Sequence, residues 1–473
     1  MNKQVLWEKI NRIGQANAEV DAALLRRFGD VLESLEGWDR LRINPLAFAE
    51  RYDFADGELI PLFLYGVKAG LFELNWNMMC PVCGGVEHSV NSLNLLEMDT
   101  FHCTLCDLDV MTELDSIIEV SFHLHESVAE LSVDPFADYE SYARYYFSQN
   151  FARPPELVKY MAEKTLMEFV SVPPQGVTEQ IVHVNPGDKL RLASFDKHLE
   201  VPLHVGSEQA PDGFVAEVTL DQAHAEHGLA VPAGTFRLRL HNPFQTTAGV
   251  IVMNGFCAVK NGPVDLPKPR FLPFLSGKML LNNQKFRAAF LVENVPNDLN
   301  LRLSDLTVLF TDLKGSTELY ERTGDIEAYR LVQHHFRILT EVVAQHNGAT
   351  VKTMGDALMA SFSTPRDGVG AALEMIARMR SLNADIGLKI GLHSGPALAV
   401  KANETVDFFG QTVNTAAHVQ SKAAAGQIWL TDRVWEADGV GDVLCKESYT
   451  EEQHTVLLKG ALKESVVYCC SPA

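Results

Sequence analysis

Long hydrophobic runs and basic residues are both scarce in this chain. The most apolar internal stretch, GVIVMNGFCAV at residues 249–259, is well short of the roughly 20 residues that a membrane-spanning helix needs. The first residues, MNKQVLWEKINRIGQ, are an amphipathic mixture without the apolar core of an export signal. Only 40 Lys and Arg stand against 61 Asp and Glu, for a formal charge of −21, whereas nucleic acids and anionic membranes are bound by clustered bases. The composition therefore predicts a cytoplasmic protein with no membrane partner, and it disfavours a nucleic-acid partner.

The eight cysteines do not form the pattern of a disulfide-linked protein. Four of them are scattered, and the other four form two CxxC pairs, Cys80 with Cys83 and Cys103 with Cys106. Two such pairs offer four thiolates to one tetrahedral zinc ion. A redox dithiol is the alternative, but that motif is typically single and lies in a βαβ context. We expect one structural Zn²⁺ on these four cysteines, without chemistry of its own, because structural zinc sites are closed.

The pattern of the sequence changes several times along the chain, which has the length of about three domains. Residues 1–76 have apolar positions at helical spacing and then a helix-turn-helix outline that ends in an alternating strand. Residues 77–114 hold the cysteine pairs and read as a zinc ribbon. Residues 115–262 open with a strand, IIEVSFHLH, and are then largely helical from Tyr139 to Phe169. From about residue 170 they continue as short strands between Pro-Gly-Asp, Pro-Asp-Gly and Pro-Ala-Gly turns, as in an all-β sandwich. Residues 263–300 are proline-rich and read as a linker with a short helix, and residues 301–473 open with an apolar strand.

The fold class that follows is a multidomain α+β protein. It has a helical, winged-helix-like module with a four-cysteine zinc ribbon, a central β-sandwich and a C-terminal α/β domain. Between residues 39 and 75 four bases stand against six acids, which is a poor balance for contacts with phosphates, so a packing module is preferred over a DNA-binding one. The β-sandwich is either a scaffold or a sensor for an unidentified small-molecule or protein regulator, because such folds serve many functions.

Two acidic residues end apolar strands in the last segment. Residues 306–310 form a continuous apolar run, typical of a strand buried on both faces, and Asp312 lies at its end. Asp356 lies in a Met-Gly-Asp turn between the two strands of ATVKTMGDALMASFS. If these strands are neighbours, the two carboxylates can hold two hard divalent ions, as in enzymes of phosphoryl transfer. Small residues follow the first strand where a helix opens, and their N–H groups are suited to phosphate oxygens: Gly315, Ser316 and Thr317.

Residues 305–470 resemble the class III nucleotidyl cyclase catalytic domain. LFTDLKGST, VKTMGDALMASF and DFFGQTVNTAAHV occur in the order and at the spacing of that family, and LLKGALKESVVY resembles its closing strand. The resemblance implies a ferredoxin-like sheet and a head-to-tail homodimer with two sites across the two-fold interface. Upstream, the region with CPVCGG and CTLC looks like modules joined to some bacterial cyclases, which suggests a bacterial signalling enzyme.

The resemblance also implies a role for each matched residue. It places two Mg²⁺ or Mn²⁺ ions on Asp312 and Asp356, and it makes Asn414 the residue that orients the ribose. Lys459, in the Leu-Leu-Lys-Gly turn, matches a lysine that contacts the triphosphate; a solvated surface lysine is the alternative. Metal ligands and base-reading groups come from different subunits in such dimers, so we expect a monomer to be inactive.

Lys352 and Asp407 match the residues that face the base. A lysine ammonium donates to a ring acceptor of adenine, and a carboxylate accepts from its exocyclic amine. Guanine presents O6 and N1–H at the same edge, and a buried mismatch of that kind is costly. The pair therefore predicts ATP over GTP. The expected reaction is attack of the ribose 3′-oxygen on the α-phosphorus, which gives 3′,5′-cyclic AMP and pyrophosphate.

His418 departs from the family pattern, which has an arginine at this position. It lies one helical turn after Asn414 and therefore on the same helix face. Histidine has no bidentate fork and is only partly charged near neutrality, and a lost transition-state donor costs about 10² to 10³-fold in rate. Three explanations compete: a protonated His418 in a slow or pH-sensitive cyclase, a substitute contact from Lys422 one turn further on, or a degenerate cyclase fold that binds ATP and signals through the zinc-ribbon and β-sandwich modules. We expect a slow or regulated adenylate cyclase.

Overall fold

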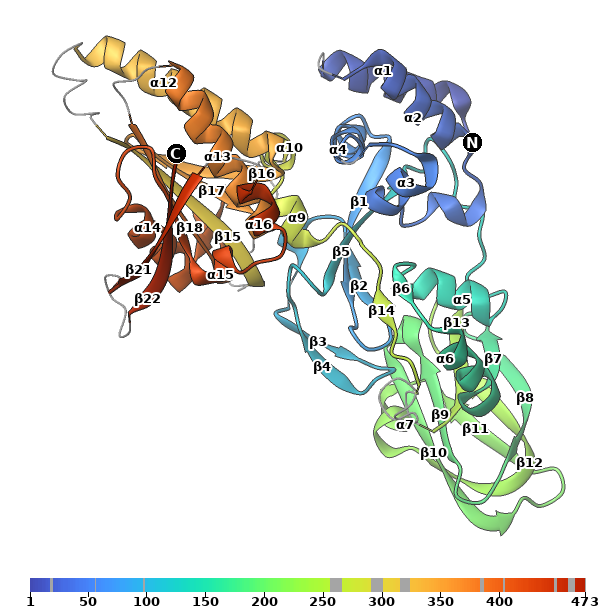
Figure 1. Cartoon of the computed structure of the whole chain (residues 1–473). Coiled ribbons are helices and arrows are strands. Elements are labelled where there is room, and N and C mark those ends of the chain that lie inside the picture. The colour runs from blue at the N-terminus through green and yellow to red at the C-terminus, as the bar shows by residue number, and fades with distance from the viewer. Residues whose placement is uncertain are drawn as a thin grey trace.

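The computed structural model describes residues 1–17, 20–55, 57–96, 98–255, 266–290, 301–314, 324–382, 387–402, 405–445, 449–457 and 464–472. Figure 1 shows an N-terminal part of helices and a small sheet, a β-rich part beside it, and an α/β part formed by the C-terminal end of the chain. This arrangement has the α+β character that the sequence predicts.

The N-terminal part packs short helices against one face of a three-stranded sheet. Its helices are α1 (Lys3–Ala16), α2 (Ala22–Ser34), η1 (Gly37–Arg40), α3 (Pro45–Tyr52) and α4 (Leu59–Lys68). The sheet has the order β2-β1-β5, with bounds Val86–Val90, Phe72–Met79 and Ile118–Leu124. Phe28, Phe63 and Phe72 form an aromatic core between the helices and β1, with ring centroids 4.8–6.1 Å apart.

The pairing of β5 with β1 corrects one predicted boundary. β5 pairs antiparallel with nearly all of β1, from Phe72 opposite Leu124 to Met78 opposite Ile118. Residues 118–124 therefore belong to the N-terminal sheet and not to the segment 115–262. The cysteine-bearing hairpin β3 (Thr100–Cys103) and β4 (Leu108–Met111) is accordingly an insertion between two strands of that sheet.

The β-rich part consists of two sheets that share the long strand β12 (Leu229–His241). Its other strands are β7 (Leu166–Val172), β8 (Val177–Val184), β9 (Lys189–Ser194), β10 (Leu199–Gln209), β11 (Val215–Thr219) and β13 (Ala248–Asn254). Its helical segments are α5 (Tyr139–Tyr146), α6 (Pro155–Tyr160), η3 (Met161–Thr165), η4 (Phe195–Lys197) and α7 (Gln222–His227). Apolar side chains from both sheets meet in one buried cluster.

A short connection leads from this part to the C-terminal domain. β14 (Arg270–Phe271) pairs with β6 (Phe151–Ala152), and α9 (Gly277–Leu281) and α10 (Gln284–Ala289) follow. The segment is thus partly structured, although its prolines predict an extended linker. One buried cluster continues from Trp76 of the N-terminal sheet through Phe286 of α10 to Phe408 of the C-terminal domain.

The C-terminal domain is built on a sheet with the order β16-β17-β15-β18-β20-β22-β21, and β19 pairs with β18. The strand bounds are β15 (Leu301–Lys314), β16 (Gly348–Met354), β17 (Ala357–Phe362), β18 (Gly387–Ala402), β19 (Thr405–Phe409), β20 (Ile428–Thr431), β21 (Tyr449–Val456) and β22 (Ser465–Pro472). The helices are α12 (Asp325–Gln345), α13 (Pro365–Leu382), α14 (Gln411–Gln420), α15 (Asp432–Trp435) and α16 (Val440–Leu444).

The first half of this domain has the ferredoxin-like connectivity that the resemblance implies. α12 connects β15 to β16, a tight turn connects β16 to β17, and α13 connects β17 to β18, while the four strands run antiparallel to their neighbours. α12 and α13 share a buried apolar cluster with one face of the sheet. The other face carries α14 and meets the cluster that extends from the N-terminal part.

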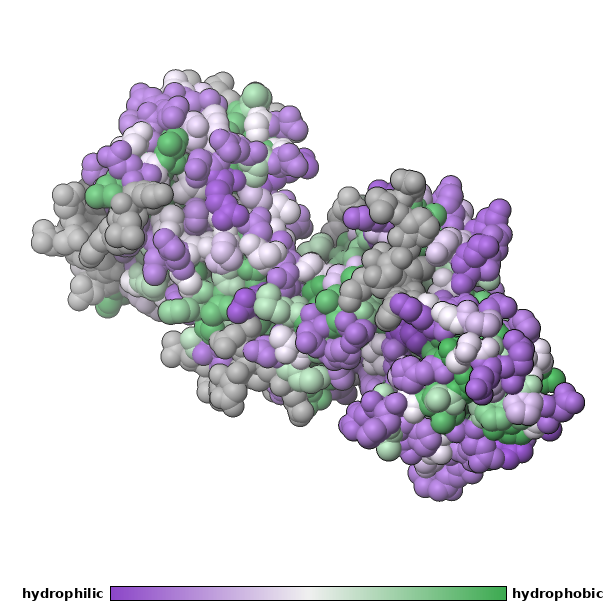
Figure 2. Space-filling view, turned by 90° about the horizontal axis from the view of Figure 1, so that it is seen from below, coloured by the Kyte–Doolittle hydropathy of each residue, from purple (hydrophilic) through white to green (hydrophobic). Residues whose placement is uncertain are grey.

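Among the coloured residues of the face shown in Figure 2, hydrophilic ones dominate, and hydrophobic ones gather in groups between them. Among the helices that the structure describes, none combines the length and the apolar character that a membrane span requires.

Candidate functional site

The carboxylates of Asp312 and Asp356 lie at the same end of two neighbouring strands. Thr311 of β15 stands opposite Leu358 of β17, and the N–H of Leu358 donates to Oγ1 of Thr311 over 3.2 Å. Asp312 is the next residue on β15, and Asp356 lies in the turn just before β17. Gly355 takes a φ of +63° in that turn, a conformation that suits glycine. The register therefore brings together two acidic residues that are 44 positions apart in the sequence.

Lys389 contacts Asp312, and the sequence analysis missed it. The two residues are cross-strand partners on β15 and β18, and Nζ of Lys389 forms an ion pair with Oδ2 of Asp312. Both side chains are partly buried, 22% and 31% exposed, so the pair is less screened than one on the surface. The available signal was a lysine between apolar residues near the start of the strand, in LKIGLHSG.

A buried histidine lies beside the Asp356 turn. His335 of α12 is 4% exposed, and its Nδ1 is 3.3 Å from Sδ of Met379. Burial lowers the pKa of His335 to about 4, although the negative charge of Asp356 acts in the opposite direction. Its Nε2 is buried without a hydrogen-bond partner among the residues that the structure describes. The imidazole of His335 is therefore neutral near pH 7 and lies close enough to Asp356 to interact with its charge.

Lys352 and Asp407 are in direct contact. Nζ of Lys352 lies 2.6 Å from Oδ2 of Asp407, and Oδ1 of Asp407 accepts from the N–H of Phe408 over 2.8 Å. Lys352 is on β16 at one end of the sheet order, and Asp407 is on β19, which folds back on β18. The Asp407 side chain is only 15% exposed, against 39% for Lys352. The fold thus pairs two polar groups that can address the edge of a base.

The short helix α10 contacts both strands that carry this pair. Oε1 of Gln284 accepts from the N–H of Thr350 on β16 over 2.7 Å, and Nη2 of Arg287 donates to the carbonyl oxygen of Val406 on β19. Burial lowers the pKa of Arg287 to about 10, and the charge of Asp407 opposes that shift. A cavity of about 240 Å³ lies between α10 and these strands. Sequence reasoning missed both residues because the segment read as a linker.

Asn414 and His418 are on α14, which packs against β15 and β18. Asn414 is exposed and His418 is half-buried, and neither side chain has a recorded hydrogen bond within the described ranges. The carbonyl oxygen of His418 accepts from Oγ of Ser421 over 2.7 Å. Lys422 follows the helix and is exposed. Four further predicted residues lie outside the described part of the chain, and their roles stay predictions: Gly315, Ser316, Thr317 and Lys459.

The four paired cysteines come together as predicted. The Sγ atoms of Cys80, Cys83, Cys103 and Cys106 all lie within 4.8 Å of one another, and all four residues are buried. In the described ranges this is the one group of three or more His, Cys, Asp or Glu side chains close enough to hold a metal ion. Hydrogen bonds from the thiols of Cys103, Cys106 and Cys83 lower the pKa of Cys80, which favours the thiolate that metals bind.

Backbone groups and neighbouring residues support the cysteine cluster. The N–H of Val82 points to Sγ of Cys80 and the N–H of Gly85 to Sγ of Cys83, each at 3.4 Å. Nη2 of Arg153 donates to the carbonyl oxygen of Cys83 over 2.8 Å. The cluster also shares a buried core with residues of the β-rich part. It therefore lies where the N-terminal sheet meets the β-sandwich.

Comparison with known proteins identifies both halves of the chain. A family described as a family of unknown function, DUF5939, matches residues 9–288, and the adenylate and guanylate cyclase catalytic domain matches residues 300–471. An adenylate cyclase of Mycobacterium tuberculosis is 28% identical over 149 residues, which cover 28% of this chain and 34% of that protein. The serine/threonine-protein kinase pkn2 of Myxococcus xanthus is 27% identical over 175 residues, 36% of this chain and 20% of that protein.

Among solved structures, the adenylyl cyclase CyaB from P. aeruginosa is 19% identical, with a TM-score of 0.31, and the match covers 37% of this chain and 97% of that one. The chain spans between a fifth and about a third of the length of the two curated relatives, 20% and 34%. The match to DUF5939 covers more than half of the chain. The chain therefore belongs to the DUF5939 family of unknown function, and its C-terminal part is an adenylate and guanylate cyclase catalytic domain.

Proposed function

We propose that this protein is an adenylate cyclase, which converts ATP to 3′,5′-cyclic AMP and pyrophosphate. The observation that carries the choice of ATP is the contact of 2.6 Å between Lys352 and Asp407. The ammonium is a donor and the carboxylate an acceptor, which suits the ring nitrogen and the exocyclic amine of adenine. In guanine, the acceptor O6 takes the place of the exocyclic amine and would lie against the carboxylate, which is also an acceptor. The desolvated mismatch would disfavour GTP.

The chemistry of the donor set supports two divalent ions at Asp312 and Asp356. Both groups are carboxylates, the ligand type that Mg²⁺ and Mn²⁺ prefer, and the register places them at one end of the sheet. Ions bound there would supply positive charge against the phosphates and would lower the pKa of the ribose 3′-hydroxyl. Lys389, already paired with Asp312, adds a fixed cation beside the same carboxylate.

We place the active site at the interface of a homodimer. The ions held by Asp312 and Asp356 of one subunit would bind the phosphates of an ATP whose base is bound by Lys352 and Asp407 of the other subunit, and Asn414 would orient its ribose. The exposed position of Asn414 on α14, without a recorded side-chain partner in the described ranges, leaves its amide accessible to such a ligand. Specific activity should therefore rise with protein concentration, because a monomer has no complete site.

The proposal is tested by incubating the purified full chain with each of the four ribonucleoside triphosphates and Mg²⁺ or Mn²⁺. Cyclic AMP should form, and cyclic GMP should form at least about 10²-fold more slowly under the same conditions. Cyclic GMP as the main product would overturn the choice of base. Bound ATP without any cyclic product, at every metal concentration, would favour the alternative of a degenerate nucleotide sensor that signals through the N-terminal zinc-ribbon and β-sandwich parts.

His418, which stands where the family has an arginine, is the reason to keep the alternative of a degenerate nucleotide sensor. The substitution His418→Arg should raise kcat by about 10 to 10²-fold, because arginine adds a permanent cation and a bidentate donor where charge develops on the α-phosphate. His418→Gln is the matched control, since it keeps a polar side chain but adds no cation. An unchanged or lower rate in His418→Arg would show that another group, such as Lys422, already supplies the contact.

We also propose that the cysteine cluster holds one structural Zn²⁺. Four buried Sγ atoms within 4.8 Å of one another suit a tetrahedral Cys₄ site, in which the ion closes the coordination sphere and leaves no open position. The role assigned to it is structural, at the junction of the N-terminal sheet and the β-sandwich.

A further inference from the structure

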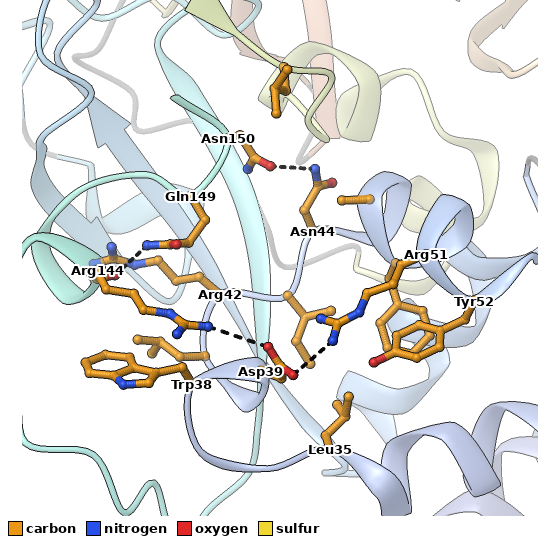
Figure 3. A pocket seen from close by; sticks show the side chains of 15 residues that line it. Leu35, Trp38, Asp39, Arg42, Asn44, Arg51, Tyr52, Arg144, Gln149 and Asn150 are labelled. Carbon is orange, nitrogen blue, oxygen red and sulfur yellow. Dashed lines mark hydrogen bonds and ion pairs between the residues drawn. The ribbon is translucent and has the colours of Figure 1, made fainter. Parts of the chain in front are cut away.

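A second pocket lies in the N-terminal part, and its lining is rich in arginine. It has a volume of about 290 Å³ and is formed by η1, α3, Arg144 of α5 and the residues that follow α5. This is close to the lower end of ligand pockets, which range from about 300 to 1,000 Å³. Figure 3 shows Arg42, Arg51 and Arg144 around it, with Asp39 between the last two. The charge of this lining contrasts with the −21 of the whole chain.

Two of the three guanidinium groups share a single carboxylate. Asp39 lies 3.3 Å from Nη2 of Arg51 and 3.6 Å from Nη2 of Arg144. Arg42 has no carboxylate within ion-pair distance in the described ranges; Nη1 donates to the carbonyl oxygen of Phe147 over 3.5 Å. Three positive charges against one negative charge line the pocket. This excess is suited to an anion, because guanidinium groups bind carboxylates and phosphates through paired N–H donors.

Arg42 is held in an unfavourable environment. Burial lowers the pKa of its guanidinium, an effect that the charge of Glu119 partly offsets. Its backbone has a φ of +48°, the left-handed region that a residue with a long side chain rarely adopts. Strained residues of this kind gather at binding and catalytic sites. A bound anion would supply the direct ion pair that Arg42 does not form in the described ranges.

The back of the pocket is a fixed pair of amides. Asn44 and Asn150 are each only 6% exposed, and Nδ2 of Asn44 donates to Oδ1 of Asn150 over 2.9 Å. Nδ2 of Asn150 donates in turn to Oε2 of Glu119 over 2.8 Å. These bonds fix both side chains, so the polar back wall is formed before a ligand arrives, which lowers the entropic cost of binding.

The remaining walls are apolar and aromatic. Leu35 and Phe48 contribute aliphatic and aromatic surface, and the ring of Trp38 lies 5.4 Å from the guanidinium carbon of Arg144. The ring of Tyr52 lies 5.3 Å from the guanidinium carbon of Arg51. Inorganic phosphate would leave this apolar surface exposed to water. An organic anion with a flat body fits the lining better.

We propose that this pocket binds a small organic anion, in which a phosphate ester or a carboxylate faces the arginines and a flat apolar body contacts Trp38 and Tyr52. The pocket also includes Leu272, whose N–H donates to the carbonyl oxygen of Asn150 over 2.7 Å. Nδ2 of Asn44 donates to the carbonyl oxygen of Pro273 over 2.9 Å. A ligand there therefore touches the segment that leads to α9 and the cyclase domain.

The test is calorimetric titration of the full chain with phenyl phosphate, benzoate and phenol at constant ionic strength. At least one of the two anions should bind, about tenfold or more tightly than phenol, because an anion adds charge-assisted hydrogen bonds. Phenyl phosphate binding alone would assign a phosphate ester, and benzoate binding alone a carboxylate. Arg51→Met and Arg144→Met should each weaken binding about tenfold; these side chains are 60% and 43% exposed, so both variants should fold.

Arg12→Met is the matched control, because Arg12 is an exposed arginine of α1 outside the pocket. Its substitution should leave binding unchanged. The proposal is overturned if neither anion binds, or if phenol binds as tightly as the anions. It is equally overturned if binding survives both pocket substitutions, because the ligand then occupies another site, or if Arg12→Met weakens binding as much as they do.

Discussion

Replacing Asp312 with asparagine should lower the rate of cyclic nucleotide formation by at least about 10³-fold, more than the loss of one transition-state donor. Asparagine keeps the size of the side chain but removes the negative charge that attracts a divalent ion. It also leaves Lys389 without its carboxylate partner, since Nζ of Lys389 pairs with Asp312. The measurements are kcat with ATP and the binding of Mn²⁺ to the protein by electron paramagnetic resonance. Both activity and Mn²⁺ affinity should fall.

Asp442→Asn is the matched control for this substitution. Asp442 is an exposed carboxylate on α16 of the same domain, so its replacement changes the net charge equally without touching the site. Its rate and Mn²⁺ affinity should equal those of the unmodified protein. If Asp312→Asn retained more than about a tenth of the rate, the carboxylate would not be a metal ligand and the two-metal arrangement would be wrong.

The geometry around Asp312 and Asp356 could be predicted in outline because it depends on local signals. The apolar run before Asp312 is a strand buried on both faces, Val308 and Leu309 being fully buried. The turn before Asp356 has a glycine at positive φ, as the Met-Gly-Asp sequence suggests. Once β15 and β17 are neighbours, their register places both acidic residues at the same end of the sheet.

The contacts that the sequence did not reveal are those between distant segments. Lys389 of β18 contacts the site because it lies opposite Asp312 of β15. Nothing in the sequence around either residue indicates this pairing. Gln284 and Arg287 belong to a helix of six residues, too short to show an amphipathic period. Their roles become visible only when α10 lies across β16 and β19. The pairing of β5 with β1 was hidden for the same reason: nearly 40 residues, from Cys80 to Ile117, separate the two strands in the sequence.

Substituting serine for Cys83 should remove the bound zinc and destabilise the N-terminal part by more than about 4 kcal/mol. Structural zinc contributes on the order of 10 kcal/mol or more to the folding of small domains, and the larger core of this chain offsets part of that loss. The loss of stability should extend beyond the loop that carries Cys80 and Cys83. Arg153 donates to the carbonyl oxygen of Cys83, and a Cβ at Gly84 would meet the ring of Phe151 at 2.4 Å, so the loop is closely fitted to the chain that enters the sandwich.

The measurements are zinc content by mass spectrometry and urea unfolding followed by tryptophan fluorescence. The unmodified protein should contain one zinc per chain, and Cys83→Ser should contain less and unfold at lower urea. Cys445→Ser is the control, because Cys445 is an exposed thiol of the C-terminal domain, far from the cluster in sequence; it should keep both its zinc and its stability. The zinc assignment would be contradicted if the unmodified protein contained no zinc as purified and unfolded at the same urea concentration as Cys83→Ser. The four thiols would then be a buried apolar cluster. The junction between the sheet and the sandwich would depend on Phe151 and Phe195, which pack against the loop that follows Cys83.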